Sequence, residues 1–97
     1  MKTLFAPLAE ADMTEIWHLL AVEYGNAAVA ERQVRRFFAA CERLAEYPLS
    51  GRARDDLSQG LRYLPIDDYL IFYRVQPNLL EVARILHGRR DIAVFFE

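Results

Sequence analysis

The chain lacks several features on which common protein classes depend. Its 97 residues include one cysteine, Cys41, so no internal disulfide can form. Secreted proteins of this size often need several disulfides, and a single cysteine therefore favours a reducing compartment. No run approaches the roughly 20 apolar residues of a membrane-spanning helix. The N-terminal stretch meets acidic residues before it reaches the apolar length of a signal peptide. We therefore expect a cytoplasmic protein with no membrane partner.

Motifs that carry common catalytic or cofactor chemistry are also missing. The sequence has no G-x-S-x-G pattern, no glycine-rich phosphate loop and no paired-carboxylate pattern. The two histidines, His18 and His87, lie far apart, and a metal site would need further ligands at suitable spacing. Cys41 is in phase with Phe37 and Leu44 on an apolar stripe, which predicts a buried and inert thiol. We expect neither a metal nor a cofactor, and we assign no catalytic residue.

Charge of one sign is not in excess. The net charge of -2 gives no overall positive field of the kind that marks a nucleic-acid-binding protein. However, every basic residue after Ser50 is an arginine, whose planar guanidinium suits bidentate binding of phosphate or carboxylate. A local arginine patch on a mildly acidic protein therefore remains open.

Apolar spacing predicts a short strand, Met1–Ala6, followed by two helices. The first is expected over Leu8–Tyr24, with carboxylates in its early turns that complement the helix dipole. Gly25 and Asn26 then supply a stop and an N-cap. The second helix is expected over about Ala27–Glu46, and a Tyr-Pro pair closes it. So short a connection predicts an antiparallel helical hairpin.

The second half of the chain predicts a sheet. After a polar loop over residues 48–60, three strands are expected at short intervals, over Leu61–Ile66, Tyr69–Val75 and Leu79–Leu86. The middle strand is apolar on both faces, as suits a central position. The sequence therefore predicts one α+β domain over residues 1–97: an N-terminal strand, a two-helix antiparallel hairpin and a three-stranded antiparallel meander.

Arginines on the predicted strands form the main candidate site. Arg62, Arg74 and Arg84 lie on adjacent strands, and alternation places Arg84 on the same face as Leu80 and Leu86. Converging cations could hold phosphate oxygens or an acidic peptide. The same arginines could equally form ion pairs with nearby aspartates, and spacing alone leaves both readings open.

Two aromatic residues of the first helix, Trp17 and Tyr24, also have two readings. Both lie on its predicted apolar stripe, which favours a place in the core. Exposed Trp and Tyr side chains, however, often anchor protein interfaces, so a groove that receives a partner's helix is the alternative.

Four stretches in a fixed order resemble the RelE/ParE family of bacterial toxins from type II toxin–antitoxin systems. They are AEADMTEIW in the first helix, LAEYPLSGR at the end of the second, GLRYLPIDDYLIFYRV into the middle strand, and VARILHGRRD after the last strand. The patterns P-x-x-G-R, G-x-R, Y-x-I-F-Y-R and R-I-L-H-x-x-R-D are similar to the ParE branch. This resemblance implies a toxin that acts on DNA gyrase, rather than one that cuts messenger RNA on the ribosome.

The residues allow a separate check of the nuclease alternative. RelE-like nucleases resemble one another in an arginine after the aromatic that begins the middle strand, and in a tyrosine or similar group in the C-terminal tail. Leu70 occupies the first position here, and the tail carries Phe95 and Phe96, which have no titratable group. His87 and Arg90 could still supply an acid or base and a cation. A ribosome-dependent endoribonuclease is therefore the alternative, and a non-toxic interaction protein of the same fold is the second.

The resemblance implies two binding surfaces on a hetero-oligomer of toxin and antitoxin. One would contact DNA gyrase, and its expected residues are Arg84, His87, Arg89 and Arg90, with Arg62 second.

The other surface would bind a cognate antitoxin. It is expected around the groove of the helical hairpin and part of the sheet, with contacts at Trp17, Leu20 and Tyr24.

Overall fold

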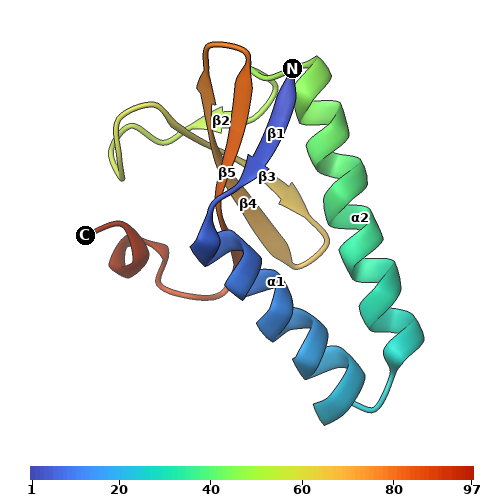
Figure 1. Ribbon diagram of the computed structural model, residues 1–97. Coiled ribbons are helices and arrows are strands. Elements are labelled where there is room, and N and C mark those ends of the chain that lie inside the picture. The colour runs from blue at the N-terminus through green and yellow to red at the C-terminus, as the bar shows by residue number, and fades with distance from the viewer.

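A computed structural model describes residues 1–97. The chain forms a five-stranded sheet and a hairpin of two helices that covers one face of it (Figure 1). The elements are β1 (Lys2–Phe5), α1 (Pro7–His18), a π-helical turn (Leu19–Glu23), α2 (Ala27–Glu46), β2 (Arg52–Ala53), β3 (Leu61–Ile66), β4 (Tyr69–Gln76), β5 (Leu79–His87) and a 3₁₀ helix (Ile92–Phe96). The predicted α+β order of strand, helical hairpin and meander is confirmed. No helix combines the length and apolar character needed to cross a membrane.

The sheet has the strand order β1-β5-β4-β3-β2. The meander strands β3, β4 and β5 pair antiparallel, whereas β1 pairs parallel with the last strand, from Lys2 opposite Leu79 to Phe5 opposite Val82. The predicted polar loop contains a strand that the sequence did not reveal, because β2 pairs only Arg52 and Ala53 with the start of β3.

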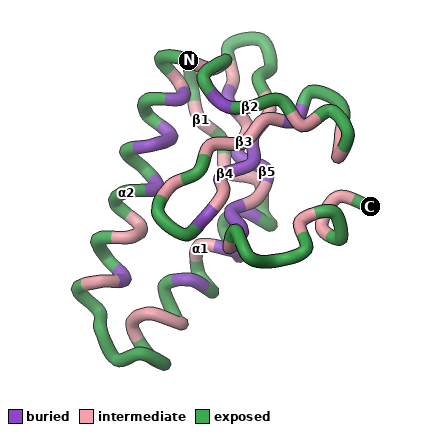
Figure 2. The backbone as a smooth tube through the Cα atoms, turned by 180° about the vertical axis from the view of Figure 1, so that it is seen from behind, coloured by how far each residue is buried: buried purple, intermediate pink, exposed green.

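The two faces of the sheet are covered differently. The helical hairpin packs on one face, where Phe37, Tyr73 and Leu80 belong to the larger apolar cluster. The other face carries a smaller cluster around Phe72, onto which the C-terminal 3₁₀ helix folds. Figure 2 shows the resulting pattern: burial is concentrated in the central strands and the inner sides of the helices.

Local signals explain where α2 begins and ends. The side chain of Asn26 accepts a hydrogen bond from the backbone N–H of Val29, as an N-cap does. Gly25 has a positive φ of 66°, which places the turn before α2 in the left-handed region that favours glycine. The predicted bounds Ala27–Glu46 are therefore confirmed.

The first helix is shorter than predicted. It ends as an α-helix at His18, and the chain continues as a π-helical turn in which Tyr24 N–H donates to the carbonyl of Leu19, five residues earlier. The wider turn delays the chain relative to an α-helix, so Tyr24 does not continue the face that carries Trp17. Hydrophobic spacing assumes a constant turn and could not anticipate this change.

The face of Arg84 is also corrected. The strand register shifts between Phe72 and Tyr73: Phe72 lies opposite Arg84, whereas Tyr73 lies opposite Val82. Ala83 is therefore the extra residue of a β-bulge, after which the alternation of faces is reversed. As a result Arg84 shares a face with Leu86, as predicted, but lies on the opposite face from Leu80.

Candidate functional site

Arg84, expected to contact a target, is instead bound inside the protein. Its Nε and Nη2 each donate a 2.8 Å hydrogen bond to the carboxylate of Asp12 on α1. The two side chains are only 15% and 8% exposed. The hydrogen bonds to Asp12 raise the pKa of Arg84, so the guanidinium stays charged. From the sequence, Asp12 is only one of the carboxylates in the early turns of the first helix that complement its dipole, because its partner lies far along the chain.

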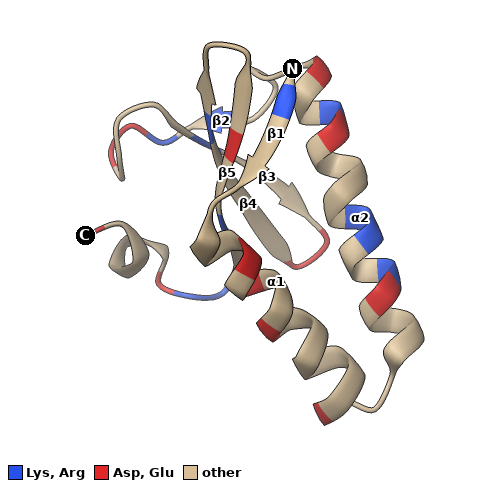
Figure 3. Ribbon diagram, in the orientation of Figure 1, with Lys and Arg blue, Asp and Glu red and all other residues tan.

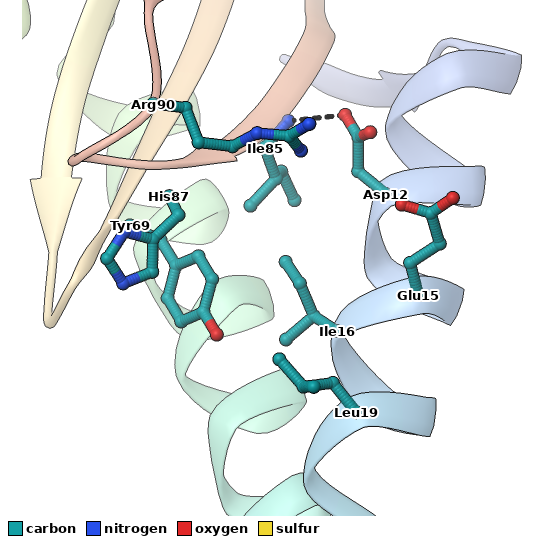
Figure 4. A pocket seen from close by; sticks show the side chains of 8 residues that line it. All are labelled: Asp12, Glu15, Ile16, Leu19, Tyr69, Ile85, His87 and Arg90. Carbon is teal, nitrogen blue, oxygen red and sulfur yellow. Dashed lines mark hydrogen bonds between the residues drawn. The ribbon is translucent and has the colours of Figure 1, made fainter. Parts of the chain in front are cut away.

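Asp12 also completes the edge of the sheet. The strand β1 pairs with β5 only as far as Val82, so the N–H groups beyond that point have no strand partner on that side. The carboxylate of Asp12 accepts the N–H of Ile85 at 2.9 Å, as the dashed line in Figure 4 shows. A side chain of α1 thus satisfies a backbone donor that would otherwise be buried and unpaired.

Arg62, which was expected second among the residues that contact the target, holds the loop before β3. Its Nη1 donates to the carbonyls of Leu49 and Gly51, at 3.3 and 2.8 Å. In the same place the hydroxyl of Tyr73 accepts the N–H of Gly51 and donates to the carbonyl of Pro48. The P-x-x-G-R and G-x-R patterns therefore meet in one structural clamp.

Gly51 is required at the centre of this clamp by close approach rather than by a turn. A Cβ at this position would lie 2.3 Å from the hydroxyl oxygen of Tyr73 and 2.8 Å from the carbonyl oxygen of Tyr63. Both distances are far below van der Waals contact. The glycine of the P-x-x-G-R pattern thus serves packing.

Three more arginines bind within the protein, two of them to aspartates as one reading of the sequence allowed. Arg36 donates to Asp67, Arg54 donates to Asp56, and Arg74 binds the hydroxyl of Ser58. These contacts are spread along the chain and do not converge on an open anion site.

The predicted target residues after β5 remain available. Arg89 and Arg90 are exposed and form no ion pair. His87 is half-buried, stacks edge-on against Tyr69 at 5.4 Å, and accepts the N–H of Arg89 through its Nδ1. That acceptor role places the proton of the neutral imidazole on Nε2. The structure thus brings His87, Arg89 and Arg90 together at the end of the last strand.

A cavity of about 270 Å³ opens beside this segment, between α1 and the end of β5. In Figure 4, His87, Tyr69 and Arg90 project from the sheet side, and Glu15 projects from α1. Apolar side chains of Ile16, Leu19 and Ile85 line the rest. The pocket combines cationic, acidic and aromatic groups around an apolar floor.

The C-terminal tail contributes two aromatic residues, which the sequence alone marked only as positions without a titratable group. The ring of Phe95 lies 5.0 Å from the guanidinium carbon of Arg84 and 4.6 Å from that of Arg90. Phe96 packs on Phe72, with 5.0 Å between ring centroids. Phe95 therefore links the buried arginine to the exposed one and orients Arg90.

The expected antitoxin residues do not form one stripe. Trp17 is 42% exposed on α1, and Leu20 packs against the main core. Tyr24 follows the π-helical turn and is 71% exposed. Burial, then the charge of Asp68, and then the phenol of Tyr24 raise the pKa of Tyr69.

The fold and these motifs define a small α+β toxin of a type II toxin–antitoxin system. The model of the family "ParE toxin of type II toxin-antitoxin system, parDE" matches residues 4–92. The chain therefore belongs to the ParE toxin family. The resemblance seen in the sequence is confirmed, including the ParE branch.

Similar proteins agree with this assignment. The chain is 36% identical over 92 residues to Toxin ParE1 of Mycobacterium tuberculosis, covering 94% of this chain and 93% of that protein. It is 34% identical over 71 residues to Toxin ParE3 of Caulobacter vibrioides, covering 73% and 71%. A solved structure, the chromosomal ParDE TA system from P. aeruginosa, matches with a TM-score of 0.72 and 19% identity. This match covers 90% of this chain and 95% of that one, and it supports the fold.

Proposed function

We propose that this toxin inhibits growth by poisoning DNA gyrase and that a cognate antitoxin neutralises it. The observation that carries the proposal is the free cationic segment after β5. Arg89 and Arg90 have no acidic partner, although nearly every arginine on the sheet does bind within the protein. Exposed arginines beside an aromatic ring are well suited to a protein interface.

The residues at the two positions that RelE-like nucleases have in common also support binding over catalysis. Leu70 packs with the apolar cluster around Phe72. Phe95 and Phe96 pack on the same side of the sheet and have no proton to transfer. Binding of gyrase requires a complementary surface only, whereas RNA cleavage requires groups that move protons at the scissile phosphate.

Within this proposal the target surface consists of His87, Arg89 and Arg90. Arg84 supports it from beneath through Phe95, whereas Arg62 holds the loop before β3 and is left out of this surface. The antitoxin would contact the helical hairpin at Trp17, where an exposed indole offers an apolar anchor.

Expression of the chain alone in growing bacteria tests the proposal. Poisoned gyrase leaves DNA breaks and induces the SOS response, whereas a ribosome-dependent nuclease leaves transcripts cut in phase with codons. DNA breaks with intact transcripts support the proposal, and codon-phased cleavage contradicts it. Normal growth without either lesion points to a non-toxic interaction protein.

Neutralisation is tested by adding the protein encoded beside the toxin gene to the same cells. Recovery of growth in the wild type, with weaker recovery for Trp17→Ala, supports an antitoxin contact at α1. Equal recovery for both forms places the contact elsewhere.

A further inference from the structure

The cavity between α1 and the end of β5 contains a tyrosine hydroxyl that has no partner within the protein. Tyr69 is only 8% exposed, and its ring meets those of Phe37 and His87 edge-on, with 5.4 Å between centroids in each case. The hydroxyl makes no hydrogen bond in the protein but is open to the cavity, into which it projects in Figure 4. Burial, followed by the charge of Asp68, raises the pKa of this phenol, so it keeps its proton and can donate.

Two further donors of the cavity come from the segment at the end of β5. Nδ1 of His87 accepts the N–H of Arg89, so the proton of the neutral ring lies on Nε2. The N–H of Arg90 donates to the carbonyl of His87 at 3.1 Å, and this turn brings the Arg90 side chain back over the cavity. Phe95 lies 4.6 Å from its guanidinium carbon, and no carboxylate forms an ion pair with it. Three donor groups, one of them a cation, therefore line the cavity.

The opposite wall limits the negative charge that the cavity can hold. The helix α1 carries acidic residues and neither lysine nor arginine (Figure 3). The carboxylate of Asp12 already accepts from Arg84 and from the N–H of Ile85. Glu15 lines the cavity, is exposed and forms no ion pair. One free cation beside one free carboxylate suits a ligand with a single negative charge better than a phosphate group, which carries up to two at neutral pH.

The floor of the cavity is aliphatic. It consists of Ile16, Leu19 and Ile85, of which the two isoleucines are 8% and 1% exposed. The volume of about 270 Å³ is close to the lower end of the range for small-molecule pockets, roughly 300–1,000 Å³. Apolar walls with a few converging polar groups are typical of such pockets. The ligand that fits is therefore small, partly apolar and anionic at one end.

We propose that this cavity binds a small organic carboxylate with a short apolar body. Arg90, His87 and Tyr69 donate to the carboxylate oxygens, and the apolar body lies against the aliphatic floor. Charge-assisted hydrogen bonds from a guanidinium are the strongest of these contacts. The site shares His87 and Arg90 with the surface proposed for gyrase, but it is defined by the cavity and does not depend on gyrase being the target.

Titration of small probes into the full ¹⁵N-labelled chain tests the charge and the apolar body separately. The probes are 4-methylpentanoate, its uncharged amide, acetate as the charge without the body, and inorganic phosphate. We expect 4-methylpentanoate to shift the amide signals of Ile16, Leu19 and Ile85 in a saturable way. The amide should bind about tenfold more weakly, because the charge-assisted hydrogen bonds are lost. Acetate should also bind at least about tenfold more weakly, because it buries fewer methylene groups. Phosphate should bind more weakly than 4-methylpentanoate.

Two pairs of variants assign the binding to this cavity. Arg90→Gln removes the cation that lines it, and Arg89→Gln makes the same change one residue away, outside the cavity. Tyr69→Phe removes the unpartnered hydroxyl and keeps the ring, whereas Tyr63→Phe removes a hydroxyl elsewhere on the sheet. We expect Arg90→Gln to weaken 4-methylpentanoate about tenfold and Tyr69→Phe to weaken it about fivefold. The two control variants should bind it as the wild type does.

The proposal is overturned if 4-methylpentanoate gives no saturable shift, if its amide or phosphate binds equally well, or if Arg89→Gln loses as much affinity as Arg90→Gln. Tighter binding of a peptide that ends in leucine would also overturn it, since the site would then take the end of a chain. A growth assay without DNA breaks would contradict the proposed gyrase target and leave these binding results untouched. The two proposals can therefore fail separately.

Discussion

Arg84 and Asp12 lie 72 residues apart in the sequence and form a two-point hydrogen-bonded ion pair that joins β5 to α1. Because both side chains are largely buried, removal of one leaves the other without compensation. We expect Arg84→Ala to lower the free energy of unfolding by about 3 kcal/mol. Urea unfolding at neutral pH measures the change. Arg89→Ala, at an exposed position, is the control and should stay within roughly 0.5 kcal/mol of the wild type. Equal stability of both variants would return Arg84 to the target surface.

The clamp around Tyr73 gives a second prediction. Tyr73→Phe removes the hydroxyl that accepts from Gly51 and donates to Pro48, and it leaves the ring in the core. We expect a loss of about 1–3 kcal/mol, since a buried N–H then has no partner. Tyr63→Phe is the matched control, because the hydroxyl of Tyr63 makes no hydrogen bond within the protein. Hydrogen exchange at the Gly51 amide should accelerate in Tyr73→Phe only, and an unchanged rate would show that water replaces the hydroxyl.

A third prediction concerns the two exposed arginines after β5 and their part in binding the proposed target. The double substitution Arg89→Ala with Arg90→Ala should lower gyrase affinity roughly tenfold, because two unpaired interface cations are lost. Growth inhibition should fall in parallel, whereas the unfolding free energy should change little. Arg32→Ala with Arg35→Ala removes the same charge from α2 and should keep full toxicity. If the α2 variant loses more toxicity than the β5 variant, the target surface lies on the helices.

A fourth prediction concerns Asp67, whose protonation should account for part of the loss of folding stability in acid. Its hydrogen bond from Arg36, with a further one from Gln33, lowers the pKa of the carboxyl group below its usual value. A lowered folded-state pKa gives stability that is present above the unfolded pKa near 3.9 and is lost as the pH falls through the folded value. The effect is small, because the pair is solvent-exposed.

Asp67→Asn provides the measurement for this group. Asparagine tolerates the positive φ of 54° at this turn, so the substitution changes charge without straining the backbone. The stability difference between wild type and variant should be present at pH 6 and shrink between about pH 4 and pH 2. A difference that stays constant over this range would mean that Arg36 does not hold the carboxylate in solution.

Local signals predicted the helical hairpin and the meander well. Asn26, Gly25 and the Tyr-Pro pair each act within a few residues, so the bounds of α2 could be read directly. The errors came from departures from regular geometry. The π-helical turn displaced Tyr24, and the bulge at Ala83 reversed the face of Arg84 relative to Leu80. Regular periods of 3.6 and 2 residues contain no information about either event.

The candidate site was predicted only in part, because sequence patterns are local. His87, Arg89 and Arg90 lie within four residues at the end of the last strand, so their proximity could be predicted from the sequence. The structural role of Arg84 depends on Asp12, and that of Arg62 depends on the loop carbonyls. Contacts between distant segments are settled by tertiary packing, which spacing along one chain does not encode.

The parallel pairing of β1 with β5 has a consequence for synthesis of the toxin. The first strand finds its partner only when Leu79–Val82 are available, and Asp12 must wait for Arg84. Contacts between the two ends of a chain close late and slow its folding. The domain therefore completes its fold only after Arg84 has left the ribosome. A chain that terminates before Leu79 lacks both the strand that β1 pairs with and the arginine that Asp12 binds, so neither contact can form.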